Sequence, residues 1–290
     1  MKHILVPTDF SESAKNALQF AIETAKIIPS KITLLHSFEV FDEVYIDYMG
    51  MSPSMSINQE INFQIIEDLK KRLEMLKQEL EKEHAIEFCT EVLNLPLAAA
   101  VEELAEEQKI DLIIMGTLGA TGLDEKIWGS RTASVIGNAP VPVLAIPGNF
   151  KWKKPEQFLL ATSNFEKDKN ILNFLFEWAD LYLAQIHTCI FTSEEWSTAK
   201  FVEQETKLNE YSAYLKSEYS ESELTANHIH GTSFEESIQK FIQEKTIDVL
   251  VMITYQHGFW KSLFNPSKTK QMSFHLNVPL LAIPASLGKE

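Results

Sequence analysis

Cysteine is scarce in this chain: its two cysteines, Cys89 and Cys189, lie a hundred positions apart in 290 residues. That spacing excludes a disulfide framework and a cysteine-rich zinc site, and it favours a reducing compartment. Long apolar runs are scarce too, because the run Ile4–Val6 near the start gives way to Pro7 and Asp9. Such a run is far shorter than a signal peptide or the roughly 20 apolar residues that span a membrane. We therefore expect a cytoplasmic protein outside the membrane.

Positive charge is also in short supply. The sequence holds 26 Lys and Arg against 41 Asp and Glu, a formal net charge of -15. A field of this sign repels phosphate backbones, so binding of DNA or RNA is disfavoured. The imbalance is larger in the first half, where 12 basic residues stand against 23 acidic ones through Pro147.

An internal repeat divides the chain. Asp-Leu-Ile-Ile-Met at 111–115 is echoed by Asp-Val-Leu-Val-Met at 248–252, and the proline-flanked segment 141–147 is echoed at 278–284. Both pairs are offset by 137 positions. Because a length of about 290 residues also predicts roughly two domains, we interpret the repeat as a duplication.

A second match fixes where the two copies differ in length. Lys-Asn-Ala-Leu-Gln-Phe at 15–20 matches Lys-Asn-Ile-Leu-Asn-Phe at 169–174, at an offset of 154. The first copy therefore carries 17 additional residues, which we place within 38–60. That region lacks clean periodicity and is typical of a loop or flap ahead of a helix.

Short apolar runs alternate with helical patterns throughout. In the first copy we predict strands at 4–6, 32–35, 86–93, 112–115 and 143–146, and helices from Ser11, at 57–83, at 96–108 and at 130–136. Alternation of this kind predicts an α/β fold in which a parallel, doubly wound, five-stranded sheet carries helices on both faces. We predict one such domain over 1–147, a linker over 148–156 and a second domain over 157–290.

The loop after the predicted fourth strand is rich in glycine, and ligands of open parallel sheets bind at the carboxyl ends of the strands. Its backbone N–H groups and the helix that begins at Ser130 favour a phosphate group. The loop is neither a Walker A motif nor a Rossmann fingerprint, because the Gly-Lys-Ser/Thr is missing and the first two glycines are three apart. A tight connection without a ligand is the alternative explanation of these glycines.

A pattern of the form Gly-x2-Gly-x9-Gly-Ser runs through this loop, carried by Gly116, Gly119, Gly129 and Ser130. It resembles the ATP-binding signature of the universal stress protein family. The resemblance extends to the segments 4–12, 34–36 and 140–144, and with the repeat it covers nearly the whole chain. It implies two tandem domains of the adenine nucleotide alpha hydrolase-like, universal stress protein fold, related by a pseudo-twofold axis.

The resemblance also implies a site for ATP, with Mg²⁺ as its expected companion, in the first domain. Its residues would be Pro7, Thr8, Asp9, His36, Ser37, Met115, Gly116, Gly119, Gly129, Ser130 and Arg131. Asp9 would accept hydrogen bonds from the ribose hydroxyls. The main chain at His36 and Ser37 would meet the adenine edge, and the glycine loop would hold the phosphates. Arg131 would add positive charge, while Lys126 is either a phosphate contact or a surface charge.

One position departs from the family pattern. Where ATP-binding relatives commonly have Gly two residues ahead of the proline that opens the third helix, this chain has Asn94 ahead of Pro96. Asn tolerates a positive φ, so the turn can form with Asn at this position.

The second copy lacks the ATP signature. The offsets place Ile253, Gln256 and Pro266 opposite the three signature glycines, and Ser163 opposite Asp9. We expect no ATP there; its aromatic residues Tyr255, Phe259, Trp260 and Phe264 either pack the vacated cleft or line a different pocket.

Histidines of the second copy raise the question of a metal site. His228 and His230 share one face of a predicted strand, and His257 follows another strand. No carboxylate or cysteine partner is evident, so we assign no metal ligand. No catalytic residue is assigned either, because no recognised triad or metalloprotease motif occurs.

Three functions remain open at this point. The first is a stress-response protein that binds ATP in its first domain and acts through nucleotide-dependent regulation or an unidentified protein partner. The second is a slow ATPase or phosphotransferase, and the third is an interaction scaffold without nucleotide. By resemblance, the apolar fifth strands 141–147 and 278–284 would pair with each other in an intrachain pseudo-dimer, to which a homodimer can be added.

Overall fold

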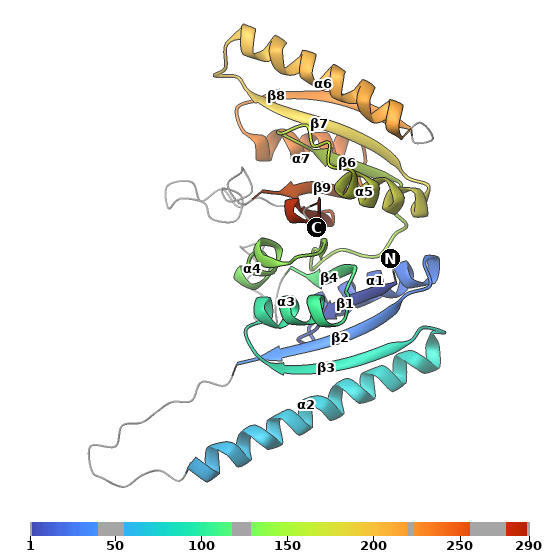
Figure 1. The fold of residues 1–290 in the computed structure, drawn as a ribbon, viewed down its shortest axis with the longest axis vertical. Helices are drawn as coiled ribbons and strands as arrows, with labels where there is room; N and C mark the ends of the chain where they lie inside the picture. Colours follow the sequence, from blue (N-terminus) through green and yellow to red (C-terminus); the bar gives the residue numbers. More distant parts are fainter. Residues whose placement is uncertain (1, 40–54, 118–128, 220–222, 256–276, 289–290) are drawn as a thin grey trace, which may run out of the picture.

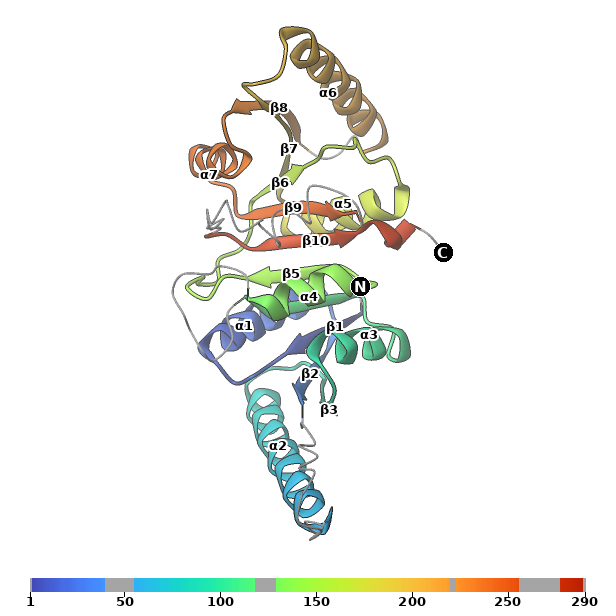
Figure 2. The same cartoon turned by 90° about the vertical axis from the view of Figure 1, so that its left-hand side faces the viewer.

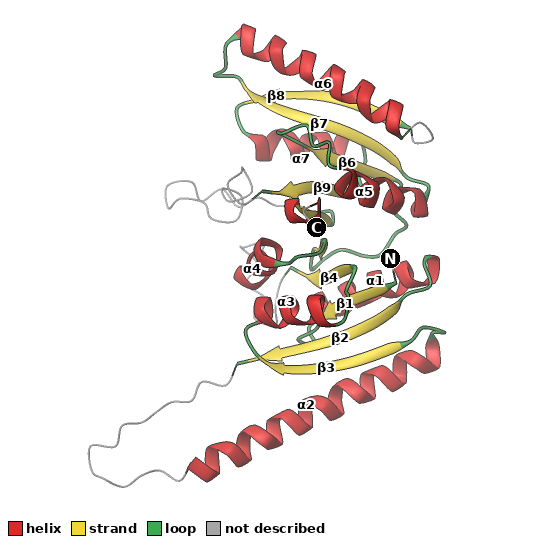
Figure 3. Ribbon diagram, viewed as in Figure 1, coloured by secondary structure: helices red, strands yellow, loops and turns green. Residues whose placement is uncertain are grey.

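One continuous sheet organises the molecule. The computed structural model describes residues 2–39, 55–117, 129–219, 223–255 and 277–288. In these residues ten strands form a single sheet of order β3-β2-β1-β4-β5-β10-β9-β6-β7-β8. Helices cover both faces (Figures 1 and 3). The predicted α/β fold, with two tandem five-stranded parallel halves, is confirmed.

The first half alternates strand and helix. Its elements are β1 (His3–Pro7), α1 (Glu12–Ile27), β2 (Lys31–Phe38), α2 (Met55–Glu83), β3 (Phe88–Asn94), α3 (Leu97–Glu107), β4 (Leu112–Gly116), α4 (Ser130–Asn138) and β5 (Val143–Ile146). The central strands are apolar runs rather than alternating patterns because helices cover both of their faces. Every residue of β1 and β5 is buried accordingly.

The second half repeats this order. Its elements are β6 (Gln157–Ala161), α5 (Lys169–Tyr182), β7 (Gln185–Ser193), α6 (Thr198–Glu218), β8 (Leu224–Gly231), α7 (Phe234–Glu244), β9 (Val249–Thr254), β10 (Leu280–Pro284) and the short helix η1 (Ala285–Gly288). No helix or strand lies between Ile146 and Gln157, where we predicted the linker.

The two halves are joined through their fifth strands, as expected. β5 and β10 pair antiparallel, with Leu144 in register with Leu281 (Figure 2). All other strand pairs are parallel. Because the junction is antiparallel, the carboxyl ends of the strands of the two halves lie at opposite edges of the sheet.

Two apolar layers run across the junction. One face of the sheet packs against α1, α2, α5 and α6, and the other against α3, α4 and α7. On the first face, the hydroxyl groups of Thr24 and Tyr182 form a buried hydrogen bond of 2.8 Å between α1 and α5. The halves therefore share their cores and a polar contact as well as their sheet.

A structural aspartate is repeated in both halves. Asp111 accepts hydrogen bonds from the backbone N–H groups of Lys2 and of His3, the first residue of β1, at 2.6 and 3.0 Å. Asp248, 137 positions later, accepts from the two N–H groups at the start of β6, at 2.8 and 3.0 Å. Each carboxylate thus ties the start of the first strand to the start of the fourth strand.

Left-handed backbone is repeated as well. Phe10 after β1 and Phe165 after β6 have φ of 63° and 51°. Lys109 after α3 and Thr246 after α7 have φ of 52° and 49°. Both halves therefore have turns with a left-handed backbone conformation, which residues other than glycine rarely adopt.

The extra length of the first half lies between β2 and β3. Helix α2 has 29 residues and its counterpart α6 has 21. Part of the surplus that we placed within 38–60 is therefore in the helix; the segment 40–54 lies outside the described residues. The N-terminal part of α2 extends well beyond the sheet (Figures 1 and 2).

No helix of the described residues is long and apolar enough to span a bilayer.

Candidate functional site

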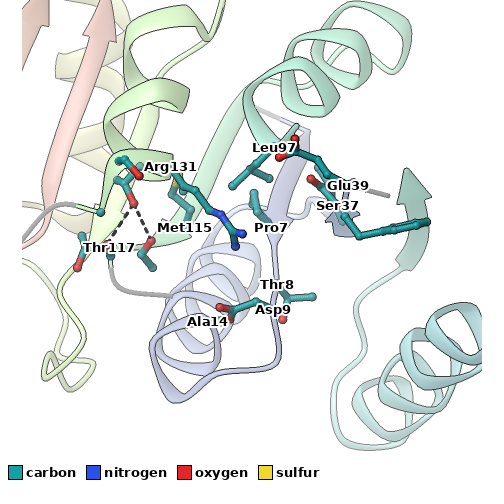
Figure 4. Close-up of a pocket in the computed structure, with 16 residues that line it drawn as sticks. Pro7, Thr8, Asp9, Ala14, Ser37, Glu39, Leu97, Met115, Thr117 and Arg131 are labelled. Atoms are coloured by element: carbon teal, nitrogen blue, oxygen red, sulfur yellow. Dashed lines mark hydrogen bonds between the residues drawn. The ribbon is translucent and has the colours of Figure 1, made fainter. Parts of the chain in front are cut away.

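A cavity of about 630 Å³ opens at the carboxyl ends of β1 and β4 (Figure 4). Chain segments from β1, β2, β4, α1, α3 and α4 surround it. Its lining residues are Pro7, Thr8, Asp9, Ala14, Leu35, Ser37, Phe38, Glu39, Leu97, Met115, Gly116, Thr117, Gly129, Ser130, Arg131 and Thr132. We call this space the strand-end cavity. It lies where open parallel sheets bind ligands.

Most of the predicted site residues meet at this cavity. The structure brings together Pro7, Thr8, Asp9, Ser37, Met115, Gly116, Gly129, Ser130 and Arg131. Gly119 and Lys126 lie outside the described residues. His36 does not line the cavity.

The N-terminus of α4 forms one wall. Gly129 is the N-cap, and its N–H donates to the carbonyl of Thr117 at 3.0 Å. The hydroxyl of Thr132 donates to the carbonyls of Gly116 and Thr117, each at 3.3 Å, which anchors the first turn of α4 on the end of β4. N–H groups of a first helical turn have no partner within the helix and carry the positive end of its dipole. The side chain of Arg131 extends into the cavity beside them (Figure 4). This wall suits an anion.

Gly116 is required by close packing. A Cβ at this position would lie 2.3 Å from the hydroxyl oxygen and 2.7 Å from the carbonyl oxygen of Ser13. Ser13 belongs to the first turn of α1, so glycine lets that turn sit directly against the end of β4. The same contact holds the α1 and α4 termini on two sides of one cavity.

The loop that carries Asp9 is held by local hydrogen bonds. The N–H of Ser11 donates to Oδ1 of Asp9 at 3.0 Å, and the N–H of Phe10 donates to the hydroxyl of Thr8 at 3.1 Å. Ser11 then caps α1 by accepting from the N–H of Ala14 at 3.2 Å. This turn presents the Asp9 carboxyl group to the cavity at the end of β1.

His36 supports this loop from the other face of β2. Ser37 lines the cavity, and successive side chains of a strand alternate between faces, so His36 points away from it. Its Nδ1 donates to the carbonyl of Thr8 at 2.8 Å, and its ring stacks on Phe10 at 5.2 Å. The guanidinium of Arg72, from α2, lies 3.8 Å from the centre of the Phe10 ring. Burial lowers the pKa of His36, which favours the neutral ring.

Asn94 does not take the positive φ that its position suggested. It is the last extended residue of β3, in register with Phe38. The turn toward α3 forms without a left-handed residue there, and Pro96 serves as the N-cap of α3.

Sequence reasoning missed several lining residues. Leu35 and Phe38 of β2, Leu97 of α3 and Ala14 of α1 add apolar side chains to the lining. Leu35, Phe38 and Leu97 adjoin the predicted residues His36 and Ser37 and the predicted helix start at Pro96, which was the available signal. An apolar residue in such a position is indistinguishable from ordinary core until the fold is known.

The equivalent place in the second half is built differently. Ile253 stands where Gly116 is in the first half. Helix α5 begins at Lys169, the counterpart of Lys15, so it has no turn equivalent to the one at Ser13 that requires glycine in the first half. The hydroxyl of Tyr255 donates to Oε2 of Glu166 at 2.5 Å in this region. Burial raises the pKa of Tyr255. The counterparts of Gly119 and Gly129, together with Phe259, Trp260 and Phe264, lie outside the described residues.

The two histidines of β8 contact Thr192 and Phe201. Nε2 of His228 and Nδ1 of His230 lie 3.0 and 3.1 Å from the hydroxyl of Thr192, and Phe201 stacks on His228 at 4.0 Å. His257 lies outside the described residues. Within the described part of the chain, no three His, Cys, Asp or Glu side chains gather closely enough to hold a metal ion.

Sequence and structure comparisons identify proteins that are similar to this chain. The family model described as Universal stress protein family matches residues 1–147. Universal stress protein MJ0531 of Methanocaldococcus jannaschii is 35% identical over 161 residues, covering 54% of this chain and 84% of that protein. Universal stress protein MJ0577 of the same organism is 32% identical over 156 residues, covering 50% and 94%. A solved universal stress protein from Archaeoglobus fulgidus has a TM-score of 0.64 at 15% identity, covering 97% of this chain and 98% of that one. The last similarity extends over both halves and concerns the fold.

Proposed function

The chain belongs to the universal stress protein family, and on this premise we propose that its first half binds ATP as a Mg²⁺ complex. The observation that carries the proposal is the strand-end cavity, where the α4 N-terminus, Arg131 and Asp9 face one space. Its volume of about 630 Å³ is that of a small-ligand site.

The walls of the cavity suit the parts of a nucleotide. The N–H groups of α4 and the guanidinium of Arg131 would bind the phosphates. Asp9, across the cavity from them, would accept from the ribose hydroxyls, because an ionised carboxyl group accepts hydrogen bonds. The apolar wall of Leu35, Phe38 and Leu97 would cover the adenine ring. Gly119 would complete the phosphate loop, as the family signature implies.

The charge of the cavity explains the expected metal ion. Asp9 and Glu39 place two carboxylates in the lining against the single guanidinium of Arg131. A triphosphate adds further negative charge, which Mg²⁺ would offset by binding phosphate oxygens and water. The protein's own part is then to orient the phosphates from α4 and to hold the ribose at Asp9.

We extend the proposal to the division of labour between the halves. We propose that the second domain, residues 157–290, binds no ATP, because Ile253 replaces Gly116 of the phosphate loop and Ser163 replaces the ribose-binding Asp9. One ATP per chain follows.

A nucleotide bound in the strand-end cavity would also affect the surface segment next to it. Glu39 lines the cavity and is the last described residue before the segment 40–54, so a bound nucleotide would touch the base of that segment. We propose that the nucleotide changes how this segment meets a protein partner. The setting would be the cytoplasm, and the net charge of -15 argues against a nucleic-acid partner.

The test is the nucleotide content of the purified chain, followed by calorimetric titration with Mg-ATP. We expect about one ATP per chain, about tenfold weaker binding by Asp9→Asn, and unchanged binding by the matched control Ser163→Ala. Brief proteolysis of the same samples should cut 40–54 more slowly with ATP in the parent protein. Two nucleotides per chain would refute the division of labour, and failure to bind Mg-ATP would refute the proposal as a whole.

A further inference from the structure

A second and larger cavity lies at the junction of the two halves. Its volume is about 1020 Å³. It is lined by Ile28, Ala105, Glu106, Lys109, Ile110, Asp111, Val141, Pro142, Phe174, Glu177, Trp178, Asp180, Leu181 and Leu287. We call it the junction cavity. Neither half forms it alone, because α1, α3 and the entries to β4 and β5 supply one side, and α5 and η1 supply the other.

The junction cavity is separate from the strand-end cavity. Lys109 to Asp111 precede β4 and Pro142 precedes β5, so this side lies at the amino ends of the first-half strands. The strand-end cavity lies at their carboxyl ends. Leu287 follows β10, whose antiparallel direction brings its carboxyl end to the same edge as the junction cavity (Figure 2). The two sites thus lie at opposite edges of the sheet and share no lining residue.

Apolar side chains make up most of the wall and continue onto the surface around it. Leu181 lines the cavity and is 36% exposed. Beyond it, Leu183 ends α5 at 84% exposure with a φ of 55°, and Ile27, next to the lining residue Ile28, is 39% exposed. Water contact with exposed apolar groups is unfavourable, and a mostly apolar cavity is typical of a binding site.

The charged side chains of the junction cavity give it a net negative charge. Four carboxyl side chains, those of Glu106, Asp111, Glu177 and Asp180, stand against the one ammonium group of Lys109. The Asp111 carboxylate is engaged by two backbone N–H groups, but it adds to the field. Beside apolar walls these charges act more strongly than in open water.

From this combination we propose that the junction cavity binds a small organic cation: an aliphatic ammonium group attached to an apolar body. The apolar body would cover Leu181 and its neighbours, and the ammonium group would meet Glu177 and Glu106. The partly exposed ring of Phe174 in the wall also attracts cations. A carboxylate ligand of the same shape is repelled, and a neutral one gains only the apolar contact. Sites of this type occur preferentially at domain interfaces.

A matched series of ligands tests the proposal on the full-length protein. Octylammonium, octanol and octanoate carry the same chain, so calorimetric titration with each separates charge from apolar contact. We expect one octylammonium per chain, weaker binding of octanol, and octanoate at least about tenfold weaker than octylammonium. Equal affinities for the three ligands, or no binding of octylammonium, would overturn the proposal.

Variants then locate the site. Glu177→Gln should weaken octylammonium binding about threefold, since an exposed ion pair contributes little more than that. Glu210→Gln, an exposed carboxylate on α6, is the matched control and should leave the affinity unchanged. Leu181→Arg should weaken octylammonium binding, because it removes an apolar contact and adds a positive charge to the wall; circular dichroism checks that each variant is folded. If the affinities of Glu177→Gln and Leu181→Arg equal those of the parent protein, the ligand binds elsewhere and the assignment is wrong.

Discussion

Substitution of Gly116 by alanine tests the packing on which the strand-end cavity depends. The new Cβ would lie 2.3 Å from the hydroxyl oxygen of Ser13, where ordinary contacts are 3.4–4 Å. The first turn of α1 would have to retreat by roughly 1 Å, because the backbone carbonyl of Ser13, at 2.7 Å, stands in the way as well. Overpacking of this kind lowers the free energy of unfolding by about 1–3 kcal/mol.

The same retreat would carry the Asp9 turn with it. Asp9 is bonded to Ser11, the N-cap of α1, so a shift of that helix moves the carboxylate away from the α4 N-terminus. The proposed hydrogen bond between the ribose and the Asp9 carboxylate is lost when it lengthens by roughly 1 Å, and this removes about 1.5–3 kcal/mol of binding free energy. Mg-ATP should therefore bind tenfold to a hundredfold more weakly to Gly116→Ala.

The assay is urea unfolding of the parent and the variant, with calorimetric titration of each with Mg-ATP. Gly137→Ala is the matched control, because Gly137 lies in α4 with no atom within 4 Å of the added Cβ. Alanine there should stabilise the protein by up to about 1 kcal/mol through helix propensity. A Gly116→Ala protein as stable as the parent, with full ATP affinity, would refute the reasoning.

Two further predictions concern the framework. Asp111→Ala and Asp248→Ala should each lower the free energy of unfolding by about 1–3 kcal/mol, because each leaves two backbone N–H groups unpaired; an unchanged free energy in urea unfolding would contradict this role. Burial holds the pKa of His36 below 6.5, so the stability from its neutral ring is complete above pH 6.5 and is lost as the pH falls below that value. Unfolding between pH 7.5 and 5.5 should therefore show a steeper loss for the parent than for His36→Gln, and parallel pH curves would speak against this.

The sheet could be predicted because its chemistry is local. A run such as Leu112–Met115 is apolar on both faces, and only a strand of a parallel sheet covered by two helical layers accounts for it. The partner of β5 came from resemblance, since the sequence of an apolar edge states only that some partner is needed.

Side-chain direction and packing at the site could not be predicted. In a strand buried on both faces, nothing in the order Leu35, His36, Ser37 says which residue faces the ligand side, and His36 faces away from it. Phe10 carries no sequence signal for a positive φ, and its ring contacts with His36 and Arg72 join segments that are distant in the sequence. The dependence of Gly116 on Ser13 joins positions a hundred residues apart, and it appears only once α1 is placed against β4.

The junction cavity could not be predicted from the sequence either, because its lining residues lie far apart in the chain. Its walls come from segments near residues 28, 110, 142, 178 and 287, which are brought together only by the antiparallel pairing of the two halves.

That pairing also fixes how the protein responds to dilution. Two separate chains that share one sheet fall apart as they become scarce, because association depends on their concentration. Here the partner of β5 is tethered in the same molecule, so its local concentration stays constant however few copies a cell contains. The shared core and the junction cavity therefore form within a single molecule, whatever the protein concentration.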